Sequence, residues 1–592
     1  MIRVLARFRR AFGLLLAHRA TVAVGMLLVP VSVALSLWIP KVVGGALEQA
    51  LRLAGPEAAA GPALAALSFA CLQVALLSLA DGVVKYFARS NLIVASRRVE
   101  EQLKNDLVAH IAHLPMEWFD RARTGDLISR LTQDVEMVRF VVGPAILHGG
   151  IALLTVPFGL WLMYGISPAL AGITVGSFAL LLTGMLALMP RLERHSKATQ
   201  EAIAAISQRA QEDFAGIRVL TNFARGGAET RALHALSEAY LGCNLRLVRL
   251  RGLMDVFVQV FRNLVVLAAL ALGAQAAVAG RLSAGELFTF LMLLQALVWP
   301  LISVGWILSA FHRAVAAADR IEEIFALAPE AAHGASPDLQ GRLEVRDLTF
   351  HYPGTTGPAL RAVSFALPAE HKLGLVGPVG AGKSALIAVL LRLYEPPRGT
   401  VFVDGIDVLD LQPKTLRGLF AIAPQDPFLF SDTIAGNVAF GRGAADASPL
   451  ADAVTDAALD EDLERIQGGL TAVIGERGIT LSGGQKQRVS LARALASQRK
   501  TLVLDDTLSA VDPTTEARIL QRLQRQRGRT LLVAAHRLSA VADADLILVL
   551  ENGAVTERGT HTELLARGGY YALTWRRQQE EHALEGSAEE LV

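Results

Sequence analysis

The sequence predicts an all-α part that crosses a membrane six times, followed by a soluble α/β domain. Hydrophobic residues make up 52% of the 592 residues and the mean hydropathy is +0.40, values above those of ordinary globular proteins. Six apolar stretches long enough to cross a bilayer precede residue 312, whereas the rest of the chain alternates short strand-like and helical patterns. The excess hydrophobicity is therefore concentrated in the N-terminal half.

Charge and cysteine content exclude several classes of function. The 57 basic residues nearly balance the 55 acidic ones, giving a net charge of +2, so nothing in the charge indicates a nucleic-acid partner. Cys71 and Cys243 are the only cysteines and lie far apart, which argues against a disulfide framework or a structural zinc site. The Arg-rich start, residues 1–19, lacks a small-residue cleavage site and predicts an interfacial helix rather than a removable signal peptide.

The first apolar stretch, residues 21–47, is interrupted by Pro30 and Pro40 but is long enough to span a bilayer. Polar segments rich in helix formers separate the second span from the third and the fourth from the fifth. Each predicts a helical hairpin whose arms, of roughly 30 residues, would extend about 50 Å. The further spans, which complete a transmembrane domain of residues 1–325, are expected at 62–86, 140–164, 169–189, 256–279 and 287–311.

The distribution of basic residues predicts the orientation of these spans. Basic side chains gather before the first span and in the two long hairpins, whereas the short loops offer mainly Arg52 and Arg281. By the positive-inside rule, both termini and both hairpins are expected in the cytoplasm. The residues that decide this are Arg3, Arg7, Arg9, Arg10 and Arg19, and, in the hairpins, Arg97, Arg98, Lys104, Arg121, Arg123, Arg130, Arg191, Arg194 and Lys197.

Polar side chains recur at helical spacing in the last two spans, where lipid would make them costly. These faces could line a substrate path, or they could make helix–helix hydrogen bonds, with Asp255 and Arg262 neutralising each other. Asp81 and Lys85, four residues apart in the second span, predict a local ion pair. The two polar faces consist of Asp255, Gln259, Arg262 and Asn263, and of Gln295, Trp299, Ser303 and Trp306.

The composition changes after Phe325. Residues 326–340, with Pro329, Gly334 and Pro337, predict a linker. Residues 341–578 predict the soluble α/β domain, and residues 579–592 an acidic tail that we expect to be frayed.

A glycine-rich segment in this domain fits the pattern G-x-x-x-x-G-K-[ST], which wraps the phosphates of a nucleotide. The strand 372–376 leads into it and a helix opens after it at Ala385, so the backbone N–H groups and the positive end of the helix face the phosphates. Lys383 is expected to reach the β and γ phosphates, and Ser384 a Mg²⁺ ion. The segment consists of Gly377, Pro378, Val379, Gly380, Ala381, Gly382, Lys383 and Ser384.

Three further patterns accompany this loop. The buried-strand pattern 501–505 ends in Asp505, the acid expected to hold Mg²⁺ through water. Before it comes a Leu-Ser-Gly-Gly-Gln segment, and after it His536 follows an apolar run. Alone, the segment could be an ordinary turn and helix cap, and His536 a satisfied histidine at a strand end. In this order and spacing, we interpret them as one nucleotide site.

With these motifs, the chain resembles an ABC transporter of the exporter kind: six spans fused to one nucleotide-binding domain, forming a half-transporter that works as a dimer. The resemblance implies that ATP and Mg²⁺ bind, that Tyr352 stacks on adenine, that Gln425 contacts Mg²⁺, and that His536 is the switch histidine at the γ-phosphate. Ser482, Gly483, Gly484 and Gln485 match the signature sequence, which closes over ATP on the other subunit, and residues 509–512 match the loop between the two sites.

The resemblance also covers the membrane part. Residues 118–126 and 216–223 look like the hairpin tips, the coupling helices that pass motion between domains in such exporters. Residues 475–478 resemble the loop that receives this signal, although Val473 stands where many exporters have an acid. The implied function is ATP-driven export of a small amphipathic molecule, a drug, lipid or peptide, across a bacterial-type cytoplasmic membrane, in contact with membrane lipid. A nucleotide-gated channel or regulatory membrane protein is the alternative.

One departure from the family pattern concerns catalysis. After the Mg²⁺ aspartate the family has a glutamate that polarises the attacking water, and this chain has Asp506. Aspartate is one methylene shorter, so its carboxylate lies about 1 to 1.5 Å further back, and misplacement on the order of 1 Å can cost a hundredfold in rate. We therefore expect a site that binds ATP but hydrolyses it slowly, as in the degenerate subunit of heterodimeric multidrug-resistance-like bacterial exporters. A homodimeric exporter remains the alternative assembly.

Overall fold

The computed structural model describes residues 7–53, 60–331, 333–442, 450–475, 481–525 and 528–589. The chain forms two compact units. Unit 1 contains residues 1–109 and 124–326, and unit 2 contains residues 110–123 and 327–592. The tip of the first hairpin, with helix α5 (Met116–Arg121), thus belongs to the same unit as the C-terminal domain.

The described part of unit 1 is helical and contains no strand. Within the described residues, six of its helices or helical runs are long and apolar enough to cross a membrane, and each overlaps one of the six expected spans. The predicted fold class, a six-helix membrane domain fused to an α/β domain, is confirmed. The helices of unit 1 are α2 (Arg9–Ala17), α3 (Arg19–Leu53), α4 (Ala60–Ile111), α6 (Thr124–Ser129), α7 (Val135–Phe140), α8 (Ile146–Ile166), α9 (Pro168–Ala215), α10 (Ile217–Asn222), α11 (Gly226–Val278) and α12 (Ala284–Phe325).

Local sequence sets the ends and crossings of these helices. Helix α12 begins with a capping box, in which the hydroxyl of Ser283 accepts from the Glu286 N–H and the Glu286 carboxylate accepts from the Ser283 N–H. Gly44 and Gly285 allow α3 and α12 to approach closely, because a Cβ at Gly285 would lie 2.3 Å from the Gly44 carbonyl oxygen. The interior between the helices is packed with aliphatic side chains such as Leu37 and Leu297.

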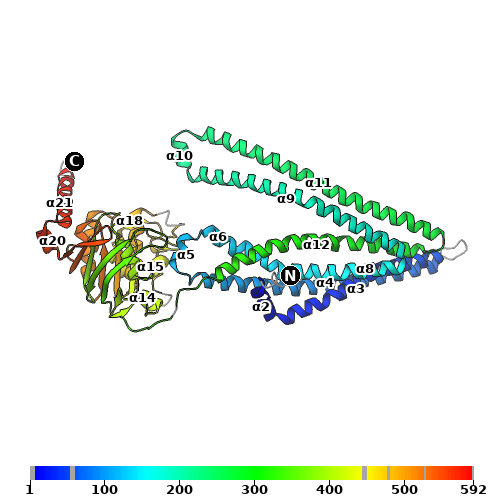
Figure 1. Ribbon diagram of the computed structural model, residues 1–592, viewed down its shortest axis with the longest axis horizontal. Helices are drawn as coiled ribbons and strands as arrows, with labels where there is room; N and C mark the ends of the chain where they lie inside the picture. Colours follow the sequence, from blue (N-terminus) through cyan, green and yellow to red (C-terminus); the bar gives the residue numbers. More distant parts are fainter. Residues whose placement is uncertain are drawn as a thin grey trace. The chain divides into compact units, whose positions relative to one another are not determined.

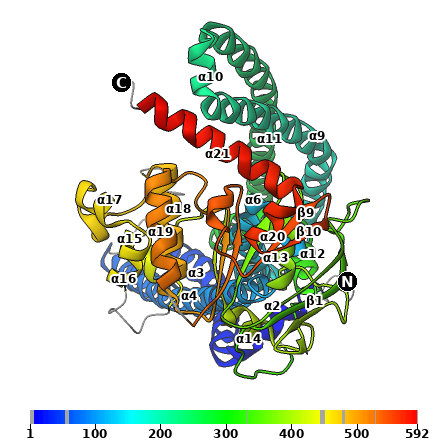
Figure 2. The ribbon, with the colours of Figure 1, turned by 90° about the vertical axis from the view of Figure 1, so that its left-hand side faces the viewer.

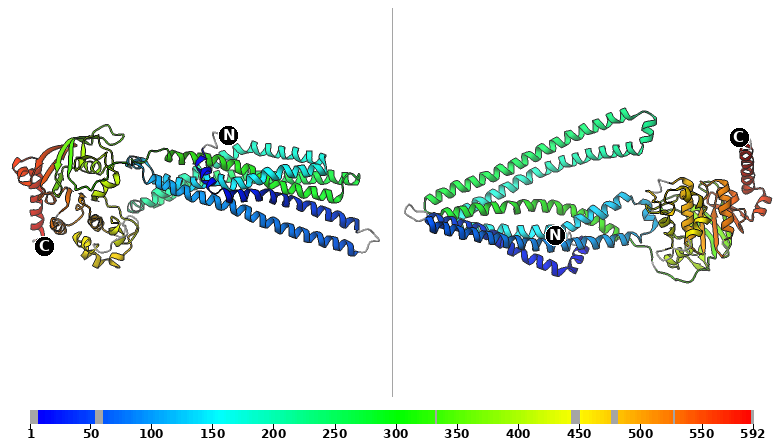
Figure 3. Two further views of the ribbon diagram at one scale, coloured as in Figure 1. Left: turned by 90° about the horizontal axis from the view of Figure 1, so that it is seen from below. Right: turned by 180° about the vertical axis from the view of Figure 1, so that it is seen from behind.

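Helices α9 and α11 form a long hairpin that diverges from α3, α4, α8 and α12 toward its tip at α10 (Figures 1 and 3). The tip has no buried residue, and Phe214, Ile217, Val219 and Phe223 around it are 76%, 52%, 59% and 74% exposed. Within unit 1, this hairpin therefore leaves a large apolar surface uncovered.

Unit 2 is built around two sheets. One is a four-stranded antiparallel sheet with strand order β2-β1-β4-β5, and the other has six strands in the order β10-β9-β3-β8-β7-β6, parallel except for β10. The strands are β1 (Leu343–Phe350), β2 (Leu360–Leu367), β3 (Lys372–Val376), β4 (Val401–Val403), β5 (Ile406–Asp407), β6 (Phe420–Ala423), β7 (Thr501–Asp505), β8 (Thr530–Ala534), β9 (Leu546–Glu551) and β10 (Ala554–Gly559).

Helices pack on both faces of the six-stranded sheet, and the group α15 to α19 lies to one side of the strands in Figure 2. The helices of unit 2 after α5 are α13 (Lys383–Leu390), α14 (Pro413–Leu419), α15 (Ile434–Ala439), α16 (Leu450–Asp456), α17 (Asp460–Arg465), α18 (Gly483–Ala496), α19 (Pro513–Arg525), α20 (His561–Arg567) and α21 (Tyr570–Glu589). Helix α21 continues to Glu589, so residues 579–589 of the expected acidic tail extend this helix.

Candidate nucleotide-binding site

The predicted site residues follow the carboxyl ends of four neighbouring strands. The phosphate loop follows β3, His536 follows β8, Asp505 ends β7 and Gln425 follows β6, and these strands are adjacent in the order β3-β8-β7-β6. Because the strands are parallel, their carboxyl ends meet at one edge of the sheet. Segments far apart in the sequence therefore converge there.

Glycines allow the phosphate loop to adopt its shape. Gly377, Gly380 and Gly382 have φ of +152°, +81° and +104°, values that L side chains rarely adopt. A Cβ at Gly377 would also lie 2.1 Å from the Leu550 carbonyl oxygen. Gly382 ends the loop and α13 begins at Lys383, so backbone N–H groups and a helix start are available for an anion.

Lys383 is a buried cation at the centre of this loop. Its Nζ donates to the carbonyl oxygens of Gly377 and Pro378, at 2.7 and 3.1 Å. Burial lowers the pKa of Lys383, while the carboxylates of Asp506 and Asp505 act in the opposite direction. The ammonium is thus held by weak neutral acceptors, which phosphate oxygens can replace with a gain in electrostatic energy.

Asp505 and Ser384 form the candidate Mg²⁺ ligands. The Ser384 hydroxyl hydrogen-bonds the Asp505 carboxylate, which is 8% exposed. Burial raises the pKa of Asp505, while Ser384, Lys383 and His536 lower it. No cluster of three His, Cys, Asp or Glu residues is present in the described ranges. One hydroxyl and one carboxylate fit Mg²⁺, which usually keeps several waters and binds substrate phosphates.

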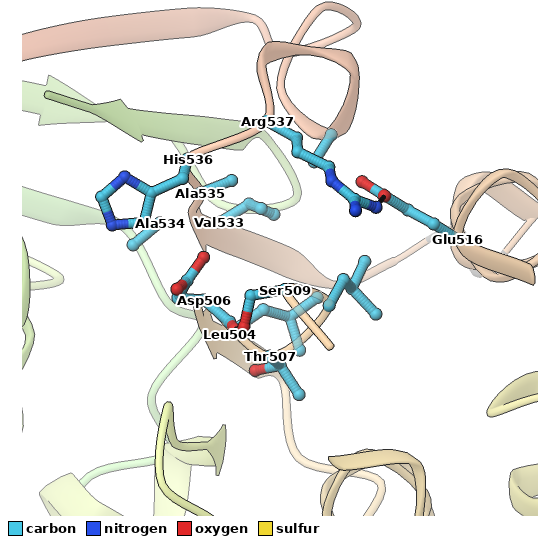
Figure 4. Close-up of a pocket in the computed structure, with 12 residues that line it drawn as sticks. Leu504, Asp506, Thr507, Ser509, Glu516, Val533, Ala534, Ala535, His536 and Arg537 are labelled. Carbon is cyan, nitrogen blue, oxygen red and sulfur yellow. Dashed lines mark hydrogen bonds and ion pairs between the residues drawn. The ribbon is translucent and has the colours of Figure 1, made fainter. Parts of the chain in front are cut away.

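Asp506 borders a cavity of about 180 Å³ beyond β7 and β8. Figure 4 shows the Asp506 carboxylate on the same side as the imidazole of His536, whereas Arg537 points away toward Glu516. Asp506 has φ +45° and donates its N–H to the Ala534 carbonyl oxygen at 2.8 Å. Aspartate is among the residues that tolerate this left-handed backbone.

Tyr352 lies beside residues that the sequence did not single out. Its ring makes edge contacts with Phe350 and Tyr394, with centroids 5.1 and 5.0 Å apart. The Tyr394 hydroxyl donates to Asp120 of α5 at 2.7 Å. Burial raises the pKa of Tyr394, and this hydrogen bond and the Asp120 charge add to the effect. The candidate adenine-stacking residue is therefore one aromatic contact from the tip of the first hairpin.

The predicted signature sequence begins helix α18. The Ser482 hydroxyl accepts from the Gln485 N–H, and the Gln485 side chain accepts from the Ser482 N–H, which completes a capping box. A Cβ at Gly484 would lie 2.8 Å from the Ala510 carbonyl oxygen, so glycine is needed there. The simple reading of the segment as a turn and cap is thus correct for its local structure, and the cap leaves the glycine amides of the first turn without partners inside the helix.

Gln487 joins this helix to the loop after Asp506. Its side chain donates to the Ser509 hydroxyl at 3.1 Å and accepts from the Ala510 N–H at 3.0 Å. Ser509 in turn donates to the Asp506 carbonyl oxygen at 2.9 Å. The start of α18 and the loop that carries Asp506 are therefore connected by hydrogen bonds within one chain.

Comparisons with known proteins agree with this arrangement. A family model described as ABC transporter transmembrane region matches residues 20–301, and a model described as ABC transporter matches residues 360–509. The chain is 34% identical to the multidrug resistance-like ATP-binding protein MdlA of Escherichia coli (strain K12) over 522 residues, covering 87% of this chain and 88% of that protein. The chain belongs to the ABC transporter family.

A second relative of this ABC transporter spans its whole length. The probable multidrug resistance ABC transporter ATP-binding/permease protein YheI of Bacillus subtilis (strain 168) is 31% identical, with 99% of each chain covered. Among solved structures, a bacterial Atm1-family ABC exporter with ATP bound has a TM-score of 0.77 at 24% identity, covering 95% of this chain and 98% of that chain. That structure supports the fold of the transporter.

Further predicted residues of the nucleotide-binding domain are exposed or lie outside the described residues. Gln425 is exposed after β6. Val473 is 71% exposed. Residues 476–478 of the predicted signal-receiving loop, 475–478, lie outside the described residues. Sequence reasoning did not identify Tyr394 or Gln487, because their hydrogen bonds join segments that are distant in the sequence. For Gln487, the only local signal is its position two residues after Gln485 of the signature.

Of the two ion pairs suggested for the membrane spans of the transporter, the described helices contain one. Asp81 and Lys85 form the predicted ion pair at 2.6 Å, and Ser32 and Ser36 also donate to Asp81. The suggested Asp255–Arg262 pair is wrong: no ion pair joins them in the described part of unit 1, since seven helical residues separate them by about 10 Å.

Arg262 instead borders a small apolar cavity between α9, α11 and α12, and its buried Nε has no hydrogen-bond partner. Ser303 is buried and donates to the Pro300 carbonyl oxygen, so it does not lie on an open face. Trp299 and Trp306 are 67% and 50% exposed. Gln295 is exposed as well, so the exposed part of the predicted face on α12 consists of one carboxamide and two aromatic rings.

Proposed function

We propose that this chain is one half of a heterodimeric exporter in which its own ATP site binds nucleotide but hydrolyses it slowly. ATP-driven export in general follows from the family. The slow site, the unlike partner and an amphipathic cargo are our proposals. We also propose that both termini and both hairpins face the cytoplasm of a bacterial cell, as the basic residues indicate.

The observation that carries the proposal is Asp506 in an otherwise complete site. The buried Lys383 ammonium and the Ser384–Asp505 hydrogen bond support a site for ATP and Mg²⁺, and Figure 4 shows the His536 imidazole on the same side as the Asp506 carboxylate. At Asp506 the carboxylate is set back by about 1 to 1.5 Å relative to a glutamate. A water placed between it and a γ-phosphate would be poorly polarised, which selectively slows the chemical step.

Within the chain, the proposed mechanism uses each side chain for one task. Tyr352 stacks on the base, Lys383 neutralises the β and γ phosphates, and Ser384 with Asp505 orients Mg²⁺. The start of α18, with Ser482 and the glycine amides, is directed at the ATP of the partner subunit. The link from Gln487 to Ser509 couples that surface to the loop of Asp506.

Two exposed surfaces support a partner subunit. The tip α10 presents apolar side chains that unit 1 does not cover. On unit 2, Phe428, Phe430 and Phe440 are 54%, 40% and 62% exposed, with Phe430 and Phe440 stacked at 4.5 Å. We propose that the corresponding hairpin tip of the partner packs on this aromatic surface, as the burial of both would be favourable.

Export and regulated channel activity predict different results. Purified heterodimer in liposomes should move an amphipathic dye only when ATP is hydrolysed, whereas an ATP-gated channel would pass solute with a non-hydrolysable analogue. Dye movement that the analogue supports at the same rate would contradict export.

The partner arrangement has its own test. Co-expression with a half-transporter that carries Leu-Asp-Glu at the corresponding place should restore fast turnover. Ser482→Arg in that complex should abolish hydrolysis, because it blocks the surface that faces the ATP of the partner. ATP binding at the site of Lys383 should persist, which serves as the control for folding. Unchanged hydrolysis in the variant would contradict the assignment.

A further inference from the structure

The C-terminal helix α21 is attached to the body of unit 2 by buried contacts. Tyr571 is fully buried, and its hydroxyl lies 2.7 Å from the His561 Nδ1. The ring of Trp575 contacts His561 with centroids 4.6 Å apart. At the start of the helix the N–H groups of Tyr570 and Tyr571 donate to the Glu557 carboxylate. These anchors fix the direction in which the following turns of α21 run.

Gln578 lies on the same side of α21 as Trp575 and Tyr571, three positions after the first and seven after the second. Its Nε2 donates to the His536 carbonyl oxygen at 2.8 Å, and its Oε1 accepts from the Leu538 N–H at 2.9 Å. Leu538 is the first residue of a short 3₁₀ helix, so its N–H has no partner inside that helix. One carboxamide thus holds both ends of the segment 536–538.

This segment determines where the His536 side chain points. His536 follows β8 directly after Ala535, and consecutive side chains diverge: Figure 4 shows the imidazole on one side and Arg537 pointing toward Glu516 on the other. Arg537 is held there by Glu516 and by the Val511 carbonyl oxygen. A rotation of the backbone at His536 would move the imidazole, and the hydrogen bonds to Gln578 oppose that rotation.

We propose that Gln578 is a positioning residue that holds the His536 imidazole toward the γ-phosphate of ATP, which makes the C-terminal helix part of the nucleotide site. The inference rests on the proposed role of His536. Gln578 itself touches neither nucleotide nor metal, so it acts only through the backbone of residues 536–538.

The test uses the full-length chain purified alone and measures its affinity for ATP and for ADP with Mg²⁺. His536→Ala should reduce the preference for ATP over ADP, and Gln578→Ala should reduce it by about five- to tenfold, the value of one to two hydrogen bonds. Gln578→Glu, which can still accept from Leu538 but cannot donate to His536, should give an intermediate loss. Gln579→Ala, an exposed neighbour, is the matched control and should change nothing.

Two readouts separate positioning from a general structural role. In the His536→Ala background, Gln578→Ala should have almost no further effect on the preference for ATP. Hydrogen exchange at the Leu538 amide, measured without nucleotide, should become about tenfold faster in Gln578→Ala. An equal loss of ATP preference in both backgrounds, or unchanged exchange and preference in Gln578→Ala, would overturn the proposal while leaving the proposed function intact. If His536→Ala has no effect, the proposed role of His536 fails and this inference fails with it.

Discussion

Asp506 differs from the family glutamate by a single methylene, yet two physical properties of the site depend on it. The shorter side chain would set the carboxylate back by about 1 to 1.5 Å, which matters for a water that must be aligned with phosphorus. The backbone of Asp506 is left-handed, at φ +45°, a conformation that aspartate tolerates better than most residues. Asp506 is therefore compatible with the fold, and we propose that its effect is mainly on the chemical step.

At the scale of single residues, Lys383→Ala should weaken ATP binding by roughly 10- to 100-fold, because a charge-assisted hydrogen bond contributes about 1.5–3 kcal/mol. The side chain is buried, so its loss also removes a charge from a region with little solvent. Equilibrium binding of a fluorescent ATP analogue measures this effect. Lys500→Ala, which removes a surface ion pair with Asp338, is the matched control. Equal affinities of Lys383→Ala and the control would show that the loop does not bind phosphate.

Mg²⁺-dependent binding should also depend on pH through Asp505. Burial raises the pKa of this carboxyl, so its ionised form is complete only above that raised pKa and is lost as the pH falls through it. Protons should therefore compete with Mg²⁺ at a higher pH than at an exposed aspartate. The measurement is Mg²⁺ affinity in the presence of ATP across mildly acidic pH. Asp505→Asn, which cannot ionise, should remove this dependence; a dependence that persists in Asp505→Asn belongs to another group.

At the scale of elements, the parallel sheet explains why the sequence motifs could be assembled without a structure. The phosphate loop, His536, Asp505 and Gln425 each end or follow a strand, and strands β3, β8, β7 and β6 are neighbours, so their carboxyl ends bring these residues together. The glycine pattern and the buried acid at Asp505 are local signals that the sequence contains in full. The position of the site at one edge of the sheet and the need for glycines in its loop could therefore be predicted from the sequence.

Contacts between distant elements were not predictable in the same way. Nothing near Tyr394 in the sequence indicates that its hydroxyl reaches Asp120, which is more than 270 positions earlier. In the membrane part, helical spacing placed Ser303 on the same face as Trp299, but the hydroxyl bonds to its own helix and the residue is buried. The Asp255–Arg262 pairing failed because residues seven apart share a helix face without being within ion-pair distance.

The contact of Tyr394 with Asp120 gives a prediction for coupling. Tyr394→Phe removes the hydroxyl that donates to the hairpin tip but keeps the ring that packs against Tyr352. ATP affinity should stay within about twofold, because the ring packing is retained, while transport per ATP hydrolysed should fall. The measurement is the ratio of dye transported to phosphate released in liposomes.

Asp120→Asn is the companion variant, since an amide oxygen can still accept from Tyr394 and should preserve most of the coupling. Normal coupling in Tyr394→Phe, or an equal loss in both variants, would show that this hydrogen bond does not transmit the signal.

At the scale of the whole molecule, two exposed apolar surfaces are ones that we expect a second subunit to cover. The α9–α11 hairpin diverges from the other helices of unit 1 with an apolar tip (Figure 1), and unit 2 exposes an aromatic surface around Phe430. In the proposed heterodimer, the signature at the start of α18 serves the ATP of the second chain. Each catalytic set would then be shared by two subunits, and Asp506 would make the site of this chain the slower one.

ATP hydrolysis by the purified chain alone tests the proposed heterodimer most directly. We expect slow turnover for the wild-type chain, since every site it can form contains Asp506. Asp506→Glu should raise the rate by about tenfold or more, as expected when a carboxylate is moved by about 1 Å toward the attacking water. Lys383→Ala should show no turnover and gives the background. Fast, vanadate-sensitive hydrolysis by the wild-type chain alone, at a rate that Asp506→Glu does not raise, would show that aspartate suffices here and would contradict the heterodimer.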